Sequence, residues 1–380
     1  MNVLHLTTHV NLGGITSYIR TLSKAMAKRG HQSSVLSSGG SAAADLASSG
    51  VPGHEVSIRT KSELNPKLYW ALPKIVRLVK EKKYDILHAH SRVTQVLAFF
   101  ISKLTGIPYV STAHGFYTPR IGRRLFPAWG KRVIAISATV SEELANTHHV
   151  PARMIRMVHN AVDLEEFLEK LNRQDRQKLR KFYGIPEGAF VVGTLSRLVR
   201  DKGHEFLLEA AQELLPEFPN LYILIVGDGR EREYLESIIR GGARHPPVPQ
   251  AGAVPLHQHA KIILGTQDTT AVLSVMDILA HPATHREGFG LSIAEAMIAQ
   301  VPVIATDIPA INTLLKDGLN GRVVKPKDAG ALASAIRDLI KDPAKARSLA
   351  MKGRETAVSI CQPERMAREI EQVYKEALSL

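Results

Sequence analysis

Two carboxylates, Glu287 and Glu295, flank a loop that contains Gly288 and Gly290, with seven residues between the two acids. Apolar spacing over 291–299 predicts a helix, and a short apolar run on each side predicts two strands. In a parallel sheet, ligands bind outside the carboxyl ends of the strands, where a helix N-terminus favours anions. Glycines let such a ligand approach the backbone closely. The stretch therefore predicts a binding site for an anionic ligand.

Two cations, Arg197 and Lys202, stand where a predicted strand over 190–195 leads into a helix. Fixed cations at a strand-to-helix turn suit a diphosphate, because each can make charge-assisted hydrogen bonds to its oxygens. The alternative is that both are ordinary surface charges.

Two glycine turns also follow predicted strands. Gly13 and Gly14 form one turn, and Gly227 and Gly229 form the other. Such turns let anions or hydroxyl-rich ligands reach bare backbone amides, although glycine also serves tight turns for steric reasons alone. The second turn is not a dinucleotide fingerprint, because Arg232 stands where the third glycine would be and no suitable acid follows. A dehydrogenase is therefore not expected.

Three histidines lie at or near strand ends. His114 comes just after a predicted strand over 108–112, a position typical of active sites. It could equally be a histidine that bonds locally in its loop. His88 and His90 are two residues apart and share one face of a strand, which raises a metal site. The sequence offers no evident third ligand, so we expect no metal there.

The segments EGFGLSIAEAM, PVIATD and LSRLVRDKG resemble signatures of the retaining nucleotide-sugar glycosyltransferases of the "group 1" family (glycosyltransferase family four), which have the GT-B fold. The resemblance covers nearly the whole chain. It implies that Glu287 lies against the donor sugar, that Glu295 binds the ribose hydroxyls, and that His114 contacts the sugar. Ser196 and Gln300 replace glycines that are usual in the family.

By this resemblance the catalytic residues are Glu287, His114, Arg197 and Lys202. The donor-binding residues it implies are Gly13, Gly14, Arg197, Lys202, Gly227, Gly229, Glu287, Gly288, Phe289, Gly290, Leu291 and Glu295. Glu295 also has a structural alternative: Ser292 and Glu295 fit a capping box, in which the acid would bond a backbone amide at the helix start.

Strands and helices alternate in both halves of the chain, which predicts an α/β protein with parallel sheets. At 380 residues the chain suits two domains. We expect an N-terminal Rossmann-like, acceptor-side domain over 1–163 and a C-terminal Rossmann-like, nucleotide-sugar-binding domain over 164–361, which face each other across a cleft. The resemblance implies that a terminal helix over 362–380 packs back on the first domain.

The composition restricts the compartment and the partners. No apolar run approaches the ~18 residues that a membrane span needs, and the start of the chain resembles no signal peptide, so we expect a cytoplasmic protein. A lone cysteine, Cys361, rules out an internal disulfide and fits a reducing compartment. The net charge of +13 indicates an anionic partner. We expect no nucleic-acid role, because no nucleic-acid-binding signature accompanies the charge.

The segment 116–132 interleaves cations with aromatic residues and contains no acid. This composition suits an anionic membrane surface, so we expect a peripheral contact with the inner leaflet. The alternative is a solvated face with the aromatics turned inward. The cations are Arg120, Arg123, Arg124, Lys131 and Arg132, and the aromatics are Phe116, Tyr117, Phe126 and Trp129.

Together these features predict a retaining glycosyltransferase that moves a sugar from a nucleotide-diphosphate sugar to a hydroxyl of a glycan or glycolipid acceptor, in cell-envelope or lipopolysaccharide biosynthesis. No cofactor or metal ion is expected, since cations and a helix dipole can neutralise the leaving group. Two rivals stay open. One is a GT-B sugar-nucleotide epimerase or hydrolase, and the other is a non-catalytic basic protein that binds membrane or nucleic acid.

Overall fold

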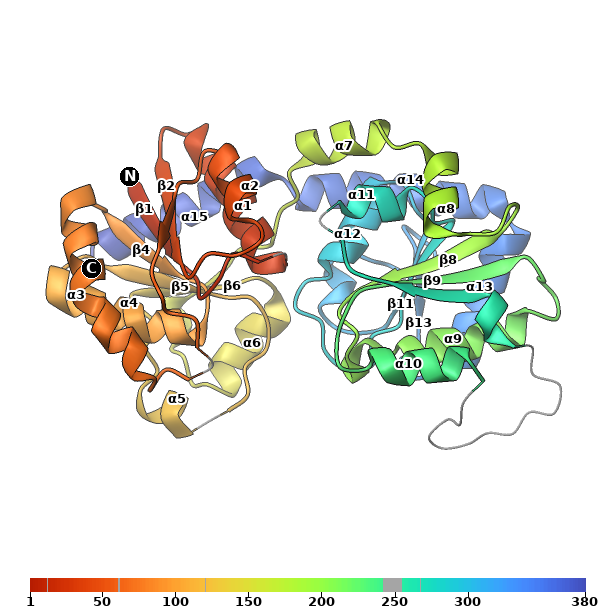
Figure 1. Ribbon diagram of the computed structural model, residues 1–380, viewed down its shortest axis with the longest axis horizontal. Coiled ribbons are helices and arrows are strands. Elements are labelled where there is room, and N and C mark those ends of the chain that lie inside the picture. Colours follow the sequence, from red (N-terminus) through yellow and green to blue (C-terminus); the bar gives the residue numbers. More distant parts are fainter. Residues whose placement is uncertain (12, 61, 120, 242–254, 267) are drawn as a thin grey trace. The chain divides into compact units, whose positions relative to one another are not determined.

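The chain divides into two compact units in a computed structural model that describes residues 1–11, 13–60, 62–119, 121–241, 255–266 and 268–380 (Figure 1). Unit 1 contains Met1–Asp163 and Cys361–Leu380, and unit 2 contains Leu164–Ile360. The proline-rich sequence over 241–259 predicts an extended loop, and most of this segment lies outside the described residues. No described helix is long and apolar enough to cross a membrane.

Unit 1 is built on a seven-stranded sheet in the order β3-β2-β1-β4-β5-β6-β7, in which every pairing is parallel. The strand order reverses between β1 and β4. The strands are β1 (Asn2–Leu6), β2 (Gln32–Ser37), β3 (Gly53–Glu55), β4 (Ile86–Ala89), β5 (Tyr109–Ala113), β6 (Arg132–Ala135) and β7 (Ile155–Met157). The helices are α1 (Gly14–Ala27), α2 (Ala43–Ser48), α3 (Pro66–Lys82), α4 (Arg92–Thr105), α5 (Ile121–Leu125), α6 (Ala138–Asn146) and α15 (Pro363–Leu378).

Unit 2 is built on a six-stranded parallel sheet in the order β10-β9-β8-β11-β12-β13, with its reversal between β8 and β11. The strands are β8 (Phe190–Leu195), β9 (Leu221–Val226), β10 (Ala260–Ile263), β11 (Ile278–His281), β12 (Val303–Thr306) and β13 (Arg322–Val324). The helices are α7 (Leu164–Asn172), α8 (Arg176–Tyr183), α9 (His204–Leu214), α10 (Arg232–Ile239), α11 (Thr269–Leu273), α12 (Leu291–Ile298), α13 (Ala329–Lys341) and α14 (Pro343–Ile360).

Local sequence explains where many of these helices start and stop. The Asn65 side chain accepts a hydrogen bond from Lys67 N at the start of α3, where Pro66 is the first helical residue. Ser91 and Thr94 form a capping box at the start of α4, and Gly106 ends that helix in a left-handed conformation.

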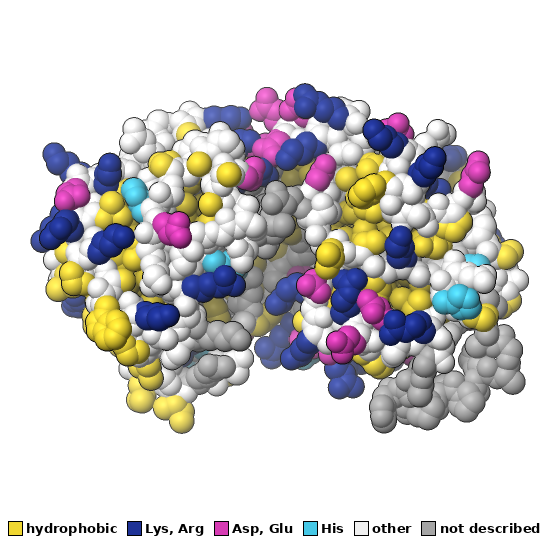
Figure 2. All heavy atoms as spheres, in the orientation of Figure 1, with side chains coloured by type: hydrophobic (Ala, Val, Ile, Leu, Met, Phe, Trp, Pro, Cys, Tyr) yellow, Lys and Arg dark blue, Asp and Glu magenta, His cyan; other side chains and the backbone are white. Residues whose placement is uncertain are grey.

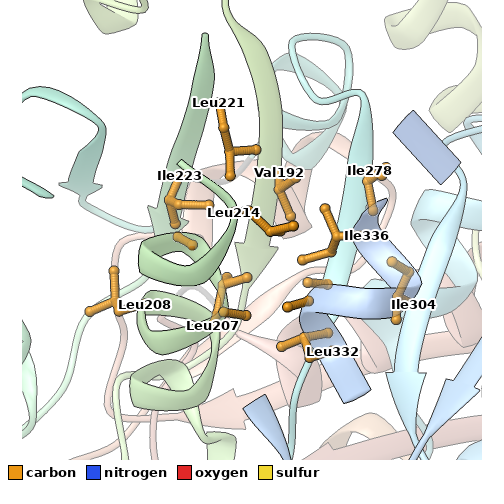
Figure 3. Packing of buried hydrophobic residues seen from close by; sticks show 14 of the residues in the cluster. Val192, Leu207, Leu208, Leu214, Leu221, Ile223, Ile278, Ile304, Leu332 and Ile336 are labelled. Carbon is orange, nitrogen blue, oxygen red and sulfur yellow. The ribbon is translucent and has the colours of Figure 1, made fainter. Parts of the chain in front are cut away.

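Helices α9 and α13 cover one face of the unit 2 sheet (Figure 3). Leu207 and Leu214 of α9 and Ile336 of α13 are buried against Val192 of β8. Both faces of a parallel sheet are covered, which is why these strands read as continuous apolar runs in the sequence.

Helix α15 belongs to unit 1, although unit 2 precedes it in the chain. The buried Tyr374 anchors its apolar face. Glu371 pairs with Arg29, and Glu376 pairs with Arg132 and Arg156.

Two predictions about structure need correction. The sequence predicts one charged helix over 164–184, but the segment forms two helices, α7 and α8, because Asp175 caps a new helix. The sequence predicts neither of the short elements α2 and β3, because they carry too little periodicity to be recognised. The aromatic and basic segment 116–132 does not lie as one face on the surface.

In that segment the Arg123 side chain is buried at 7% exposure, which contradicts its prediction as a membrane-facing cation. Its guanidinium lies over the rings of Tyr117, at 4.1 Å, and Trp129, at 4.7 Å, and donates to Gln95 at 3.2 Å. Trp129 is buried as well. Arg123 therefore organises the interior of the segment, and Arg120 lies outside the described residues.

Candidate functional site

The predicted acids and cations of unit 2 follow β8 and β11, the two strands between which the strand order reverses. Loops at the carboxyl ends of such strands diverge and leave room for a ligand. Arg197 and Lys202 lie in the loop after β8, and Glu287 lies in the loop after β11.

Gly203 brings these two loops together. Its φ is +64°, and a Cβ added there would lie 2.1 Å from the carbonyl oxygen of Pro282. The Thr284 amide donates to Asp201 O at 2.9 Å across the same junction. A glycine is required because both the backbone conformation and the close approach exclude a side chain.

Glu287 is the centre of the resulting cluster. One of its carboxylate oxygens, Oε2, accepts from Lys202 Nζ and lies 2.7 Å from His281 Nε2, while Oε1 accepts from the Gly288 amide at 3.0 Å. Burial alone would raise the pKa of Glu287, but the hydrogen bond and charge of His281 and the charge of Lys202 hold that pKa well below its usual range. Glu287 is therefore a carboxylate at neutral pH.

His281 was missed by the sequence analysis. The signal that could have found it is a polar residue at the carboxyl end of an otherwise apolar strand. Its side chain is buried and points to the same oxygen as Lys202.

Arg197 is exposed just beyond the end of β8. Within the described part of the chain its guanidinium has no carboxylate partner within 4 Å, in contrast to Lys202. An exposed and unneutralised cation next to the loops of the reversal point is available to an anionic ligand.

Gly227 and Gly229 serve the packing of this region. Each has a φ of +158°, and added Cβ atoms would lie 1.9 Å from Ser196 O and 2.3 Å from Leu198 O. The Leu198 amide donates to Asp228 O at 2.9 Å. The β9–α10 loop thus lies directly against the loop that carries Arg197.

The N-terminus of α12 follows the Glu287 loop. Gly290 is its N-cap with a φ of +84°, and the cap lacks a side-chain hydrogen bond. Gly288, two residues before this N-cap, and Leu291, directly after it, are each half-buried. The Phe289 side chain is only 2% exposed, so any role in binding falls to its backbone.

Glu295 lies one turn into α12, and the capping-box alternative is wrong. The N-cap is Gly290, so Ser292 is already inside the helix and cannot cap it. Burial raises the pKa of Glu295 to about 7, opposed in part by a hydrogen bond with Thr269 of α11. Among the described residues no cation pairs with Glu295, and helix capping does not explain a buried acid at this position.

In unit 1 the predicted residues also lie near a reversal point, that between β1 and β4. Gly13, with a φ of +149°, is the N-cap of α1, and space beside it and Gly14 is open, since added Cβ atoms would meet nothing within 4 Å. His114 directly follows β5, the neighbour of β4.

His88 and His90 have the third histidine that the sequence did not reveal. His5 of β1 is in register with His88 of β4, and ligand atoms of His5, His88 and His90 lie within 4.8 Å of one another. The reason given for rejecting a metal was therefore wrong. Strand pairing, which brings His5 to this place, is invisible in the local sequence.

Comparisons with known proteins agree with this architecture. The family model described as "Glycosyl transferases group 1" matches residues 175–356, and the model "Glycosyltransferase Family 4" matches residues 12–166. The chain is 25% identical over 386 residues to N-acetyl-alpha-D-glucosaminyl L-malate synthase of Bacillus anthracis, with 98% of this chain and 96% of that protein covered.

Two further similarities bear on function. The chain is 26% identical over 280 residues to UDP-Gal:alpha-D-GlcNAc-diphosphoundecaprenol alpha-1,3-galactosyltransferase of Escherichia coli, with 70% of this chain and 69% of that protein covered. The crystal structure of Anabaena HepE in complex with UDP-glucose matches with a TM-score of 0.79 at 23% identity and covers 100% of both chains.

Two parallel-sheet, Rossmann-like domains with these structural relatives define the GT-B class of glycosyltransferases. The chain belongs to the group 1 glycosyltransferases, glycosyltransferase family 4, and is an enzyme of that kind.

Proposed function

We propose that this enzyme transfers a hexosyl group from a nucleotide-diphosphate sugar to an acceptor hydroxyl, with retention of anomeric configuration. The observation that carries the proposal is the cluster of Lys202, His281 and Glu287, together with the exposed Arg197 in the loop after β8 that also carries Lys202. The UDP-glucose bound by Anabaena HepE supports a nucleotide-sugar donor.

The charges of this cluster suit a diphosphate leaving group. Lys202 has three N–H donors and uses one on Glu287, so it can also bind a phosphate oxygen. Arg197 supplies a second cation, and it need not break an ion pair with any described residue to bind a phosphate. Preorganised positive charge stabilises the negative charge that develops as the sugar–phosphate bond breaks. The proposal needs no cofactor or metal ion for this step.

Both oxygens of Glu287 accept hydrogen bonds that hold the carboxylate in place, which disfavours covalent attack by it, whereas Oε1 accepts only one bond from the described residues and keeps an acceptor position for a sugar hydroxyl. We therefore assign it to binding the sugar. In front-face transfer the acceptor oxygen bonds to the anomeric carbon on the side from which the diphosphate leaves. The hydroxyl proton passes to the departing phosphate oxygen, so no enzyme nucleophile is required.

A test compares Arg197→Ala and Lys202→Ala with Arg337→Ala. Arg337 pairs with Glu213 and Glu217, near the end of α9 that lies away from the β8 loop, so it is a matched cation outside the site. With UDP-sugars and candidate acceptors, the first two variants should lose roughly 10²- to 10³-fold in turnover and Arg337→Ala should lose little. Unchanged turnover in both site variants would refute the diphosphate assignment.

The type of reaction needs two further measurements. Donor alone should release little nucleotide, whereas an epimerase or hydrolase would act without an acceptor. NMR of the product should show the anomeric configuration of the donor; inversion would refute the retaining mechanism.

We also propose that unit 1 contacts an anionic membrane that presents a lipid-linked or glycolipid acceptor. The Escherichia coli relative is named for a diphosphoundecaprenol acceptor, which supports this class. The surface consists of four large apolar residues of unit 1 that are each 78% or more exposed: Leu64, Trp70, Ile121 and Leu125.

Figure 2 shows hydrophobic side chains gathered over α3 and α5 in unit 1. Arg92 ties the two parts together, because it donates to Glu63 Oε1 at 3.1 Å and to Phe126 O at 2.6 Å. Exposed Lys67 and Arg124 flank the apolar residues in the chain. Apolar anchors beside cations suit an anionic interface.

Co-sedimentation with vesicles that contain anionic lipid tests this surface. Trp70→Ser combined with Ile121→Ser should reduce binding, whereas Phe182→Ser, which removes an equally exposed aromatic from unit 2, should not. Binding should fall as salt rises, because the Debye screening length falls to ~3 Å at 1 M ionic strength and weakens the attraction between the cations and the anionic lipid. If the wild-type protein ignores anionic vesicles at low salt, the acceptor is presented in solution.

A further inference from the structure

Unit 1 buries a network of histidines that the donor site in unit 2 does not use. His5 comes from β1, His88 and His90 come from β4 and its end, and His114 follows β5. These strands are neighbours in the sheet, and His5 is in register with His88. Polar side chains so deep in a sheet need hydrogen-bond partners.

Three of the imidazoles form one chain of hydrogen bonds. His114 Nε2 lies 2.9 Å from His90 Nδ1, and His90 Nε2 lies 3.0 Å from His5 Nδ1. The chain ends where His5 Nε2 lies 3.5 Å from the hydroxyl of Ser23 in α1. It leads from the core of the unit to the predicted sugar-contacting residue.

His88 belongs to a separate branch. Its Nδ1 lies 2.7 Å from the Tyr374 hydroxyl, and its Nε2 lies 2.6 Å from Thr112 Oγ1. The Tyr18 hydroxyl lies 3.3 Å from the same Thr112 oxygen. His88 thus touches the same core without a hydrogen bond to His114.

All four imidazoles are neutral at physiological pH. Burial lowers the pKa of His5 and of His114 to about 3. Burial and the neighbouring imidazoles lower the pKa values of His88 and His90 well below the usual range. A neutral imidazole has one N–H and one bare nitrogen, so each link in the chain fixes the direction of the next.

The free end of the chain is Nδ1 of His114. It has no hydrogen-bond partner in the described part of the chain, and His114 itself is half-buried rather than fully enclosed. The Tyr18 ring stands edge-on to the imidazole, with the centroids 4.7 Å apart, and limits rotation of the ring.

We propose that His90 and His5 are positioning residues that hold His114 as a neutral imidazole, with Nδ1 presented to a hydroxyl of the bound sugar or acceptor. If all N–H groups point toward Ser23, Nδ1 accepts a hydrogen bond; if they point the other way, Nδ1 donates one. In either direction the chain of hydrogen bonds lets His114 bind a hydroxyl, as acceptor or as donor, without burying a charge. Only the identity of that hydroxyl rests on the proposed function.

A metal ion explains the histidine cluster less well than the hydrogen-bond network does. His88 and His90 each use both ring nitrogens on protein groups, so an ion held by His5, His88 and His90 would have to break bonds that already satisfy them. The network is complete from its own side chains.

A pair of variants at one position separates the two links. In His90→Asn the amide reaches about where Nδ1 was, so the bond to His114 is kept and the bond to His5 is lost. In His90→Gln the amide reaches about where Nε2 was, which keeps the bond to His5 and loses the bond to His114. His88→Gln disturbs the same core on the other branch.

The first readout is independent of activity: ¹⁵N NMR of histidine-labelled protein, which reports the tautomer and titration of His114. We expect a neutral, hydrogen-bonded His114 in the wild type, in His90→Asn and in His88→Gln, and an altered His114 in His90→Gln. The second readout is transferase kcat/KM, which should fall roughly tenfold to a hundredfold more in His90→Gln than in His90→Asn at similar stability.

Other results would overturn the proposal. These are a wild-type His114 that titrates near its ordinary value, identical His114 signals in the two His90 variants, or stoichiometric zinc in the isolated protein. If the NMR result is as expected but no nucleotide sugar is turned over, the positioning of His114 by His90 and His5 is supported and the proposed function fails.

Discussion

Both sheets carry polar groups where their strand order reverses, but those groups are charged in unit 2 and neutral in unit 1. At the reversal point of unit 2, Glu287 is buried as an anion because Lys202 and His281 stabilise it. At the reversal point of unit 1, imidazoles are buried against one another and stay neutral. A charged site can bind phosphate, whereas a neutral one suits hydroxyl groups. The two sites therefore differ in the chemistry that they offer to a ligand.

The largest expected effect is acid sensitivity of unit 1. A histidine whose pKa is lowered from 6.5 to about 3 contributes stability above pH 6.5 that is lost as pH falls toward 3. At pH 5, His5 and His114 together should therefore cost about 4 kcal/mol. In unit 2, His204 shows a comparable shift, to about 4.

Tryptophan fluorescence measures this effect selectively, because both tryptophans, Trp70 and Trp129, lie in unit 1. The urea midpoint followed by fluorescence should fall between pH 7 and pH 5, and by more than the midpoint followed by circular dichroism. Equal midpoints at both pH values would contradict the burial of neutral histidines.

Glu287→Gln should have the next largest effect. The amide oxygen can still accept a hydrogen bond from the Lys202 ammonium, but the side chain carries no negative charge, so the sugar loses its anionic partner and turnover should fall by roughly 10²- to 10³-fold. Affinity for free nucleotide diphosphate, measured by calorimetry, should change little, because Lys202 remains. Equal losses in turnover and nucleotide affinity would place Glu287 at the nucleotide instead. Glu187→Gln, an exposed acid of the same unit, is the control.

Gly203→Ala tests whether loop contact builds the charged site. The new Cβ would combine left-handed strain with a 2.1 Å clash against Pro282 O, and we expect a loss of roughly 2 to 4 kcal/mol in unfolding free energy. Gly188→Ala has a similar φ of +72° but meets nothing within 4 Å, so only the strain should appear there. Equal losses in the two variants, from urea unfolding, would show that the contact contributes nothing.

Glu295→Gln should have the smallest effect, and its direction depends on pH. A carboxyl whose pKa is raised to about 7 favours folding below pH 4.5, and this contribution is lost as pH rises through 7. At pH 8 the variant should therefore be more stable than the wild type, by up to about 3 kcal/mol. Its nucleotide affinity should nevertheless be lower, because an amide offers the ribose hydroxyls one acceptor oxygen. A variant that is less stable at pH 8 with unchanged affinity would indicate a structural acid.

The sequence by itself determined most strands and helices, because buried parallel strands are continuous apolar runs and the helices between them repeat with helical spacing. Family motifs also led to the loops that carry Arg197 and Glu287 and to the helix that carries Glu295. These features are local, and the residues that define each one are close in the chain.

Only the tertiary structure decided which of these groups meet. Lys202 and Glu287 are 85 positions apart and are joined because Gly203 lets their loops touch. His5 meets His90 across the same number of positions because β1 pairs with β4. Arg123 is buried because Tyr117 and Trp129 pack against it, although the basic residues next to it in the sequence are typical of an exposed segment. Strand pairing and side-chain burial are long-range outcomes of packing, and local sequence patterns do not contain them.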